Sequence, residues 1–359
     1  MILTYKYRLR NKHAKYTLSK HAYACNQVWN YCVAIQKKSQ QNYRLGGNTK
    51  WLGKYDFVDL TKGISKELGI NAQTVQNVCH EFTQSRDQHK KIPKFRKSSG
   101  AKRSLGWVSF QEQSRQISKD SITYTGNTYK LFGCKKRPLP SNAKGGCFVQ
   151  DSLGHWYVCF SVDVPVTSTT ATQEVGIDLG LKTLATLSTG EKMDSVTPYR
   201  KYEEKLATAQ KANNKKQVKR IHAKIKNVRK DYLHKATTKI TKENKSIFVG
   251  NVCSSKLAKT NMAKSIYDAA WSMFRNMLNY KSSRNSAYYK EIDERFSTQI
   301  CSSCNKITEG SPKGIADLGI RIWACSNCGV LHDRDVNAAK NILRFGLSVQ
   351  PLAEGSSLS

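Results

Sequence analysis

Four cysteines near the end of the chain have the spacing of a metal site. They form two Cys-x-x-Cys pairs, Cys301-Ser-Ser-Cys304 and Cys325-Ser-Asn-Cys328, with 20 residues between the pairs. This pattern is typical of a tetrahedral zinc site with four thiolate ligands. Chance pairing and a redox motif are the alternatives. Because such a site leaves no coordination position for a substrate, the spacing predicts a structural Zn²⁺.

Two aspartates lie at positions where a carboxylate is expected to have a specific binding or structural role. Asp178 interrupts the apolar stretch VGIDLG, which reads as a strand, and a buried carboxylate is costly unless it binds a partner or a cation. Asp335 lies in HDRDVNAAKNIL at the predicted start of a helix, where free backbone N–H groups would hold its carboxylate, and a role as N-cap alone is the alternative for this residue. Taken together, the two acids predict a Mg²⁺ site for phosphodiester cleavage by two metal ions.

The charge of the chain points to a polyanionic partner. Its 359 residues include 60 Lys and Arg but only 26 Asp and Glu, which gives a net charge of +34. With aromatic residues interleaved, such an excess favours nucleic acid, and a ribosomal-type or merely solvated basic surface is the alternative. A loop-like basic segment at 90–104 supplies candidate contacts to the nucleic-acid backbone. These are Lys94, Arg96, Lys97, Lys102 and Arg103.

The pattern of apolar residues predicts an α/β chain of two or three units. An alternating N-terminal strand, a helical segment up to residue 90 and an antiparallel β unit, expected as a small barrel, make up the first half. A Thr-rich linker leads to the Asp178 strand and its hairpin partner. The elements expected after these are a basic helical hairpin at 198–243, a strand ending in Gly250, a helix at 263–280, a strand YYKEIDERF and a final helix from Asp335.

The charged N-terminus and the lack of a long apolar window predict a cytosolic protein. MILTYKYRLR carries charges where a signal peptide needs an apolar run, and no window approaches 18 uninterrupted apolar residues. Cytosolic thiols stay reduced, so the scattered cysteines are expected to be inert core thiols. They are Cys25, Cys32, Cys79, Cys134, Cys147, Cys159 and Cys253.

Three motifs in order, VGIDLGLKTLATLSTG, CSSC…CSNC and HDRDVNAAKNIL, resemble the TnpB family of transposon-encoded RNA-guided nucleases, ancestors of the type V CRISPR effectors. The resemblance implies an α/β multidomain chain with an RNase H-like RuvC domain. The implied parts are a β-barrel wedge domain at 1–12 and 90–166, a helical recognition domain at 13–89, the RuvC nuclease domain at 174–300 and 330–345, a zinc-finger insert at 301–329 and a disordered tail at 346–359.

What the resemblance implies about function is RNA-guided cleavage of double-stranded target DNA beside a short adjacent motif. Mg²⁺ would be the catalytic cofactor, and the guide RNA would come from the transposon end. The chain would work in the prokaryotic cytoplasm, associated with the nucleoid. A nuclease-dead, RNA-guided repressor is the alternative, and an RNA-binding chaperone without guided targeting is a third reading.

Two of the three RuvC acids of the family have a counterpart in this sequence. Asp178 matches the first RuvC acid and Asp335 the third, but the strand that usually ends in the second, a glutamate, ends here in Gly250. Either catalysis is lost, or another carboxylate replaces the missing one, as in a branch of the family that this stretch resembles.

Relocation is physically feasible if the Gly250 strand lies between the Asp178 strand and YYKEIDERF. Neighbouring strands are only about 4.7–4.9 Å apart, so a glutamate beyond could reach over a residue that lacks a side chain. Glu294 is preferred and Glu291 is the other candidate; their odd separation predicts opposite faces. Asp293, Asp268 and Glu243 rank lower. The predicted Mg²⁺ ligands are therefore Asp178, Glu294 and Asp335.

Overall fold

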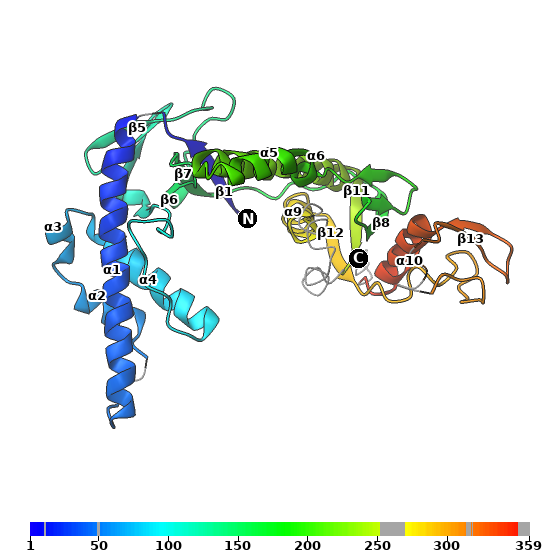
Figure 1. Cartoon of the computed structure of the whole chain (residues 1–359), viewed down its shortest axis with the longest axis horizontal. Helices are drawn as coiled ribbons and strands as arrows, with labels where there is room; N and C mark the ends of the chain where they lie inside the picture. The colour runs from blue at the N-terminus through cyan, green and yellow to red at the C-terminus, as the bar shows by residue number, and fades with distance from the viewer. Residues whose placement is uncertain (11, 49–50, 252–269, 314–316, 318, 351–359) are drawn as a thin grey trace, which may run out of the picture. The chain divides into compact units, whose positions relative to one another are not determined.

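The computed structural model describes residues 1–10, 12–48, 51–251, 270–313, 317 and 319–350 (Figure 1). The chain divides into two compact units, residues 1–164 and 165–359, each with its own hydrophobic core. None of the described helices is both long and apolar enough to cross a membrane. Cys253 and Asp268 lie outside the described residues, as does the first part of the helix predicted at 263–280.

The first unit contains the helices that the apolar spacing predicts. They are α1 (Lys12–Arg44), α2 (Lys54–Leu60), α3 (Ile64–Leu68) and α4 (Ala72–His89). The side chain of Asn71 caps α4 by accepting a hydrogen bond from the Gln73 N–H at 2.8 Å. Buried residues at helical spacing, such as Val28 on α1 and Phe82 on α4, join both helices to one core.

Antiparallel strands complete this unit. One sheet has the order β1-β7-β6-β2, made of β1 (Ile2–Arg8), β2 (Trp107–Gln111), β6 (Ala143–Gln150) and β7 (Trp156–Asp163). After a 3-10 turn at Glu112–Ser114, a second sheet contains β3 (Arg115–Ile117), β4 (Ser121–Tyr124) and β5 (Asn127–Lys130). A bridge between Leu9 and Leu131 links the two sheets. The N-terminal strand pairs as predicted, and the closed barrel stays a prediction.

The second unit is built on a five-stranded mixed sheet with the order β10-β9-β8-β11-β12. The strands β8, β11 and β12 are parallel, whereas β9 and β10 are antiparallel to their neighbours. Because β11 lies between β8 and β12, the strand order on which relocation depends is confirmed. The bounds are β8 (Gln173–Leu179), β9 (Thr183–Leu187), β10 (Lys192–Asp194), β11 (Asn244–Gly250) and β12 (Tyr288–Ile292).

Helices cover both faces of this sheet. Val249 of β11 shares a core cluster with Phe274 of α9 (Trp271–Arg284), whereas the adjacent Phe248 clusters with Ile342 of α10 (Arg334–Ser348). Successive strand residues point to opposite faces, so α9 and α10 lie on opposite sides. The basic hairpin predicted at 198–243 is present as α5 (Pro198–Lys211) and α6 (Lys215–Glu243) (Figure 1).

Three predicted boundaries were wrong. The final helix begins at Arg334 rather than Asp335, and it continues to Ser348, so the disordered tail cannot begin at 346. The reason is packing: a Cβ at Gly346 would overlap the buried ring of Phe248. The strand YYKEIDERF ends at Ile292, which leaves Glu294 two residues beyond it. Between this strand and α10, the short strands β13 (Ile322–Ala324) and β14 (Leu331–Asp333) pair with each other.

Candidate active site and metal centre

The carboxylate of Glu294 lies in the space that a side chain at position 250 would occupy. Gly250 ends β11 opposite Ile292 of β12, and the Asn251 N–H donates to the Ile292 carbonyl at 3.0 Å. A Cβ built on Gly250 would lie 2.6 Å from Glu294 Oε2 and 3.4 Å from Glu294 Cβ. An added Cβ at this distance would force the Glu294 carboxylate to shift, so the observed position of this carboxylate depends on glycine at position 250.

Glu291 faces the other side of the sheet. It pairs with Val249 in the strand register, its Oε2 lies 3.4 Å from Arg275 Nη1 on α9, and its Oε1 accepts from the Tyr289 hydroxyl at 3.2 Å. The opposite orientation expected for the two glutamates is therefore confirmed. Of the lower-ranked acids, Asp293 pairs with the exposed Arg295 at 2.6 Å, and Glu243 is exposed at the end of α6.

Asp178 lies in β8 opposite Thr186, between the buried residues Ile177 and Leu179. Burial raises the pKa of the Asp178 carboxyl well above its usual value, and the charges of Glu294 and Asp335 raise it further. Arg334 and Arg321 act in the opposite direction. Burial also raises the pKa of Glu294, which Arg275 partly offsets. The three predicted acids thus form one electrostatic cluster.

Asp333, and not Asp335, caps the final helix. Asp333 Oδ1 accepts hydrogen bonds from the N–H groups of Asp335 at 3.1 Å and Val336 at 3.0 Å, while its Oδ2 lies 2.6 Å from Lys192 Nζ. The capping role predicted for Asp335 is therefore wrong, because the preceding aspartate already satisfies these donors. The Asp335 carboxylate instead lies 3.3 and 3.4 Å from Arg321 Nη1.

A cavity of about 270 Å³ opens over two of the acids. It combines carboxylates, which suit a hard cation, with lysine and arginine side chains, which suit a phosphate. Glu294 is not part of its lining. The lining residues are Asp178, Gly180, Lys182, Thr183, Thr186, Lys192, Arg321, Asp333 and Asp335.

Arg321 is a site residue that the sequence did not reveal. It precedes β13, and its carbonyl accepts a hydrogen bond from the Arg334 N–H at 2.8 Å, which places the Arg321 side chain against the start of α10. No motif in the sequence marks it, since the contact depends on the pairing of β13 with β14. The neighbouring basic side chains are less available: His332 and Arg334 are both buried.

We predict that Gly250→Ala will displace the Glu294 carboxylate and lower any activity that depends on it. The new methyl group would also lie 3.3 Å from Ile342 Cδ1, so it cannot move away easily. A displacement of about 1 Å at a reacting centre costs on the order of 100-fold in rate. Cleavage rates of the two proteins would measure this loss, and Gly319→Ala, where an added Cβ meets no atom within 4 Å, is the control. Equal rates for Gly250→Ala and the unaltered chain would contradict the assignment.

A second prediction follows from the raised pKa of Asp178. The carboxyl of Asp178 keeps its proton to higher pH in the folded chain than in the unfolded chain, where the pKa of Asp is about 3.9. The contribution of this group to the free energy of unfolding is therefore complete below that unfolded pKa and is lost as pH rises through the folded pKa. Asn stays neutral. Metal-free Asp178→Asn should therefore be more stable than the unaltered chain by about 0.5–2 kcal/mol near pH 8 and should not gain near pH 3. Thermal melts at both pH values test this, and equal Tm values near pH 8 would contradict it.

The four cysteines form a cluster that fits a single zinc ion. Their Sγ atoms all lie within 4.8 Å of one another, with Cys301 to Cys328 at 3.7 Å and Cys304 to Cys325 at 3.6 Å. Zn–S bonds of about 2.3 Å in a tetrahedron place sulfurs about 3.8 Å apart. The amide N–H groups of Cys328 and Asn327 lower the pKa of Cys325 to about 6, which favours the thiolate form.

This cysteine cluster differs from the carboxylate cluster. Among the residues with described positions, the four sulfurs are the one set of three or more Cys, His, Asp or Glu atoms close enough to share an ion. His332 supports the cysteine cluster, since its Nε2 lies 3.0 Å from Cys301 Sγ. By the same measure, Asp178, Glu294 and Asp335 are not close enough together to share a single ion.

The proposed nucleic-acid contacts in the first unit do not form one uniform surface. Lys94, Lys97, Lys102 and Arg103 are exposed, and Arg103 Nη1 donates to Gln150 Oε1 at 2.9 Å. Arg96 is half-buried: its guanidinium carbon lies 3.6 Å from the centroid of the Trp29 ring, and burial lowers its pKa. The lysines are therefore the more accessible part of this set.

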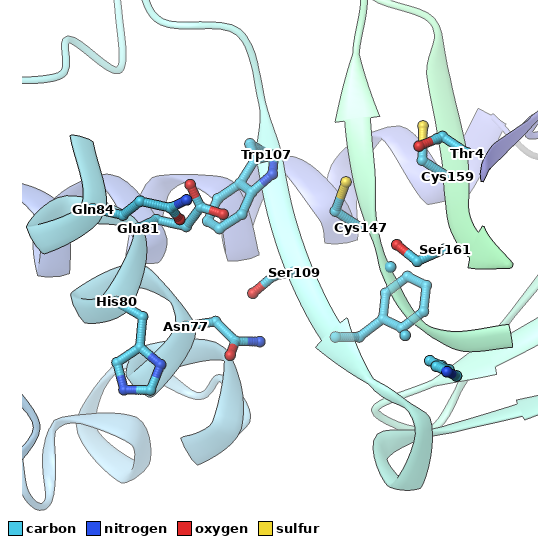
Figure 2. Close-up of a pocket in the computed structure, with 14 residues that line it drawn as sticks. Thr4, Asn77, His80, Glu81, Gln84, Trp107, Ser109, Cys147, Cys159 and Ser161 are labelled. Carbon is cyan, nitrogen blue, oxygen red and sulfur yellow. The ribbon is translucent and has the colours of Figure 1, made fainter. Parts of the chain in front are cut away.

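A second hollow, of about 390 Å³, lies in the first unit between α4 and the β1-β7-β6-β2 sheet (Figure 2). Cys147 and Cys159 both line it and face each other in the β6–β7 register, so their prediction as core thiols was wrong. They alternate with core residues along strands that bury only one face. Of the other single cysteines, Cys25, Cys32 and Cys79 are buried as predicted, and Cys134 is half-buried.

Comparison with known proteins gives two family matches. Residues 157–261 match a family described as "Probable transposase", and residues 271–342 match "Cas12f1-like, TNB domain". A protein of Streptomyces pristinaespiralis named "Putative RNA-guided DNA endonuclease" is 38% identical over 238 residues, which cover 61% of this chain and 57% of that protein. The chain thus spans little more than half of that relative.

Two further similarities extend over most of the chain. The Escherichia coli protein "Putative RNA-guided DNA endonuclease InsQ" is 24% identical over 379 residues, covering 94% of this chain and 90% of that protein. A solved Cas12f1 chain, in a complex with sgRNA and target DNA, aligns with a TM-score of 0.37 and 13% identity over 96% of this chain and 99% of its own. The sequence matches confirm the predicted resemblance.

Proposed function

We propose that this chain, a relative of the transposon-encoded TnpB proteins, is an RNA-guided endonuclease that cuts double-stranded DNA beside a short adjacent motif. The observation that carries this proposal is the grouping of Asp178, Glu294 and Asp335 at one end of the sheet in a chain of net charge +34. Two relatives whose matches cover 61% and 94% of the chain have names that begin "Putative RNA-guided DNA endonuclease", which supports the guided DNA cleavage in this proposal.

The sheet supports a RuvC assignment. Three parallel strands flanked by an antiparallel pair, with helices on both faces, are consistent with an RNase H-like nuclease domain. In this assignment the segment at 301–329 is a zinc-finger insert, and α1–α4 and the antiparallel sheets of the first unit are the recognition and wedge domains. The wedge domain would be a small barrel.

The three acids would hold catalytic Mg²⁺. When bound, Mg²⁺ polarises the phosphate and lowers the pKa of a bound water. The chain itself supplies the positions: Asp178 from β8, Asp335 from the first turn of α10, and Glu294 from the turn after β12. Burial, followed by the negative charges of Glu294 and Asp335, raises the pKa of Asp178, and a bound cation would offset those charges.

Basic side chains would orient the DNA at this site. Arg321 and Lys192 line the same cavity as Asp178, and their charges complement phosphate oxygens. Arg321 is 55% exposed, so it can exchange Asp335 for a phosphate without uncovering a buried charge. Lys192 remains tied to the helix cap through Asp333. We therefore assign Arg321 to phosphate binding.

The direct test is cleavage of a target plasmid in Mg²⁺ by the purified chain with its co-expressed native RNA. The target and its adjacent motif come from the locus or from a randomised library. The unaltered chain should cut, and Asp178→Ala should bind the target without cutting. Guided binding without cutting by the unaltered chain would show a guided repressor instead. Binding without any dependence on the guide would show an RNA-binding protein of another kind.

With the same protein–RNA preparation, the affinity for nucleic acid can be measured as a function of salt concentration. Guide RNA and DNA would neutralise phosphates on many basic side chains, so affinity should fall by about 10³-fold or more between 50 and 200 mM salt. Replacing Lys94, Lys97 and Lys102 by Ala should lower the slope of log affinity against log salt by up to about three. Filter binding at four salt concentrations measures the slope. An affinity that is independent of salt would contradict nucleic-acid binding through these charges.

A further inference from the structure

We propose that Asn337 and Asn341 of α10 are positioning residues that hold the turn between Glu294 and Cys301, and thereby fix the Glu294 carboxylate over Gly250. The structural part of this inference is independent of the proposed function. Its consequence for cleavage rests on that function. We call these two side chains the asparagine clamp.

The clamp consists of five hydrogen bonds to one short segment. Asn341 Nδ2 donates to the carbonyls of Ser297 at 2.8 Å and Ile300 at 2.6 Å. Asn337 Nδ2 donates to the same carbonyls at 3.3 and 2.8 Å, and its Oδ1 accepts from the Ser302 N–H at 2.8 Å. Residues 297–302 are therefore fastened to α10 at three backbone positions.

Because both asparagines are buried, loss of these hydrogen bonds would be costly in free energy. Asn337 is 1% exposed and Asn341 is 0% exposed, so water cannot replace the lost partners without entering the interior. The two residues are four apart on one helix and so lie on the same face. Both carbonyl partners only accept hydrogen bonds, so Asn341 must present Nδ2 to them. Its Oδ1 consequently has no partner among the described residues.

The relocation of the acid explains why a clamp is needed. A glutamate at position 250 would be held by the hydrogen bonds of β11, which is paired on both sides. Glu294 instead lies two residues beyond the end of β12, where no strand pairing holds it. Its carbonyl accepts from the Ser297 N–H at 3.0 Å, so the clamped residue Ser297 is bonded directly to it. The clamp thus takes the place of the strand pairing that Glu294 lacks.

The same clamp connects the other parts of the site. Asp335 is two residues before Asn337 on α10, and Cys301 lies between the clamped residues Ile300 and Ser302. One set of hydrogen bonds therefore ties Glu294, the helix that carries Asp335 and the first cysteine pair together. Loss of the clamp should loosen the Glu294 turn before it disturbs binding of nucleic acid elsewhere in the chain.

The test compares Asn341→Leu and Asn337→Leu, which keep the side-chain shape but remove the donors, with the matched control Asn244→Leu. Asn244 is also buried in the second unit, and its Nδ2 donates to the Ile240 carbonyl at 2.9 Å, far along the chain from Glu294. Hydrogen–deuterium exchange of the amides of 295–302, zinc content, target binding and single-turnover cleavage are measured on the full chain with its RNA. Asn341→Asp, a change of nearly equal size, replaces any variant that fails to fold.

We expect both clamp variants to exchange these amides at least about 10-fold faster, to bind target within about twofold, and to cleave about 10- to 100-fold more slowly with a higher Mg²⁺ requirement. Asn244→Leu should show none of these effects on 295–302. Unchanged exchange in the clamp variants would overturn the proposal, as would fast exchange with normal cleavage. If the unaltered chain does not cleave at all, the proposed function fails, and exchange alone then decides for or against the clamp.

Discussion

Glu294→Gln should lower the rate of guided DNA cleavage by at least about 100-fold, whereas Glu291→Gln should leave it within about twofold. The two glutamates are a matched pair, three positions apart on one segment. Glu294 lies against Gly250 and contributes to the raised pKa of Asp178. Glu291 pairs with Arg275 on the face covered by α9. Plasmid cleavage by each variant with the same RNA measures the difference.

Target binding is the control in this experiment, because removing one carboxylate should not weaken contacts to the guide or to the DNA. A double variant, Gly250→Glu with Glu294→Ala, then asks whether the position of the carboxylate matters more than its residue number. Partial recovery of cleavage relative to Glu294→Ala alone would support relocation of the second acid from position 250 to position 294. Loss of cleavage in Glu291→Gln with full activity in Glu294→Gln would show that the wrong glutamate had been assigned.

The part of this site that depends on strand order was predictable from the sequence. At the glycine that ends this otherwise apolar strand, the family resemblance implies a carboxylate, which left loss of catalysis and relocation as the two explanations. Relocation requires the next strand to supply the acid. The observed order, with β11 between β8 and β12, meets that requirement. The spacing of the four cysteines was equally informative, because a tetrahedral ion restricts both pairs locally.

The wrong predictions, and the site residue that was missed, concern contacts between segments that are distant in the sequence. Asp335 and Asp333 are both plausible caps in HDRD, and only the backbone at the start of α10 shows that Asp333 takes the role. Arg321 reaches Asp335 through the pairing of β13 with β14, which no local pattern marks. Cys147 and Cys159 alternate with core residues, but the open face above them depends on how α4 lies over the sheet.

Removal of zinc should have the widest effect on the second unit. Cys325→Ser, or chelation at neutral pH, should release about one zinc per chain and forfeit a binding free energy on the order of 10–16 kcal/mol. Cys325 and Cys301 are almost fully buried and form a small core cluster of their own with Trp323. We therefore expect local unfolding of the segment at 301–329.

That unfolding should also abolish cleavage. Arg321 lies between the two cysteine pairs, and the Ser302 N–H bond to Asn337 joins the first pair to the asparagine clamp. Metal analysis, limited proteolysis and plasmid cleavage measure the three consequences, with Cys134→Ser, a half-buried thiol of the first unit, as the control. Protein that is free of zinc and cuts at the normal rate would refute the structural role, whereas proteolysis confined to 301–329 with intact target binding would separate the metal centre from recognition of the nucleic acid.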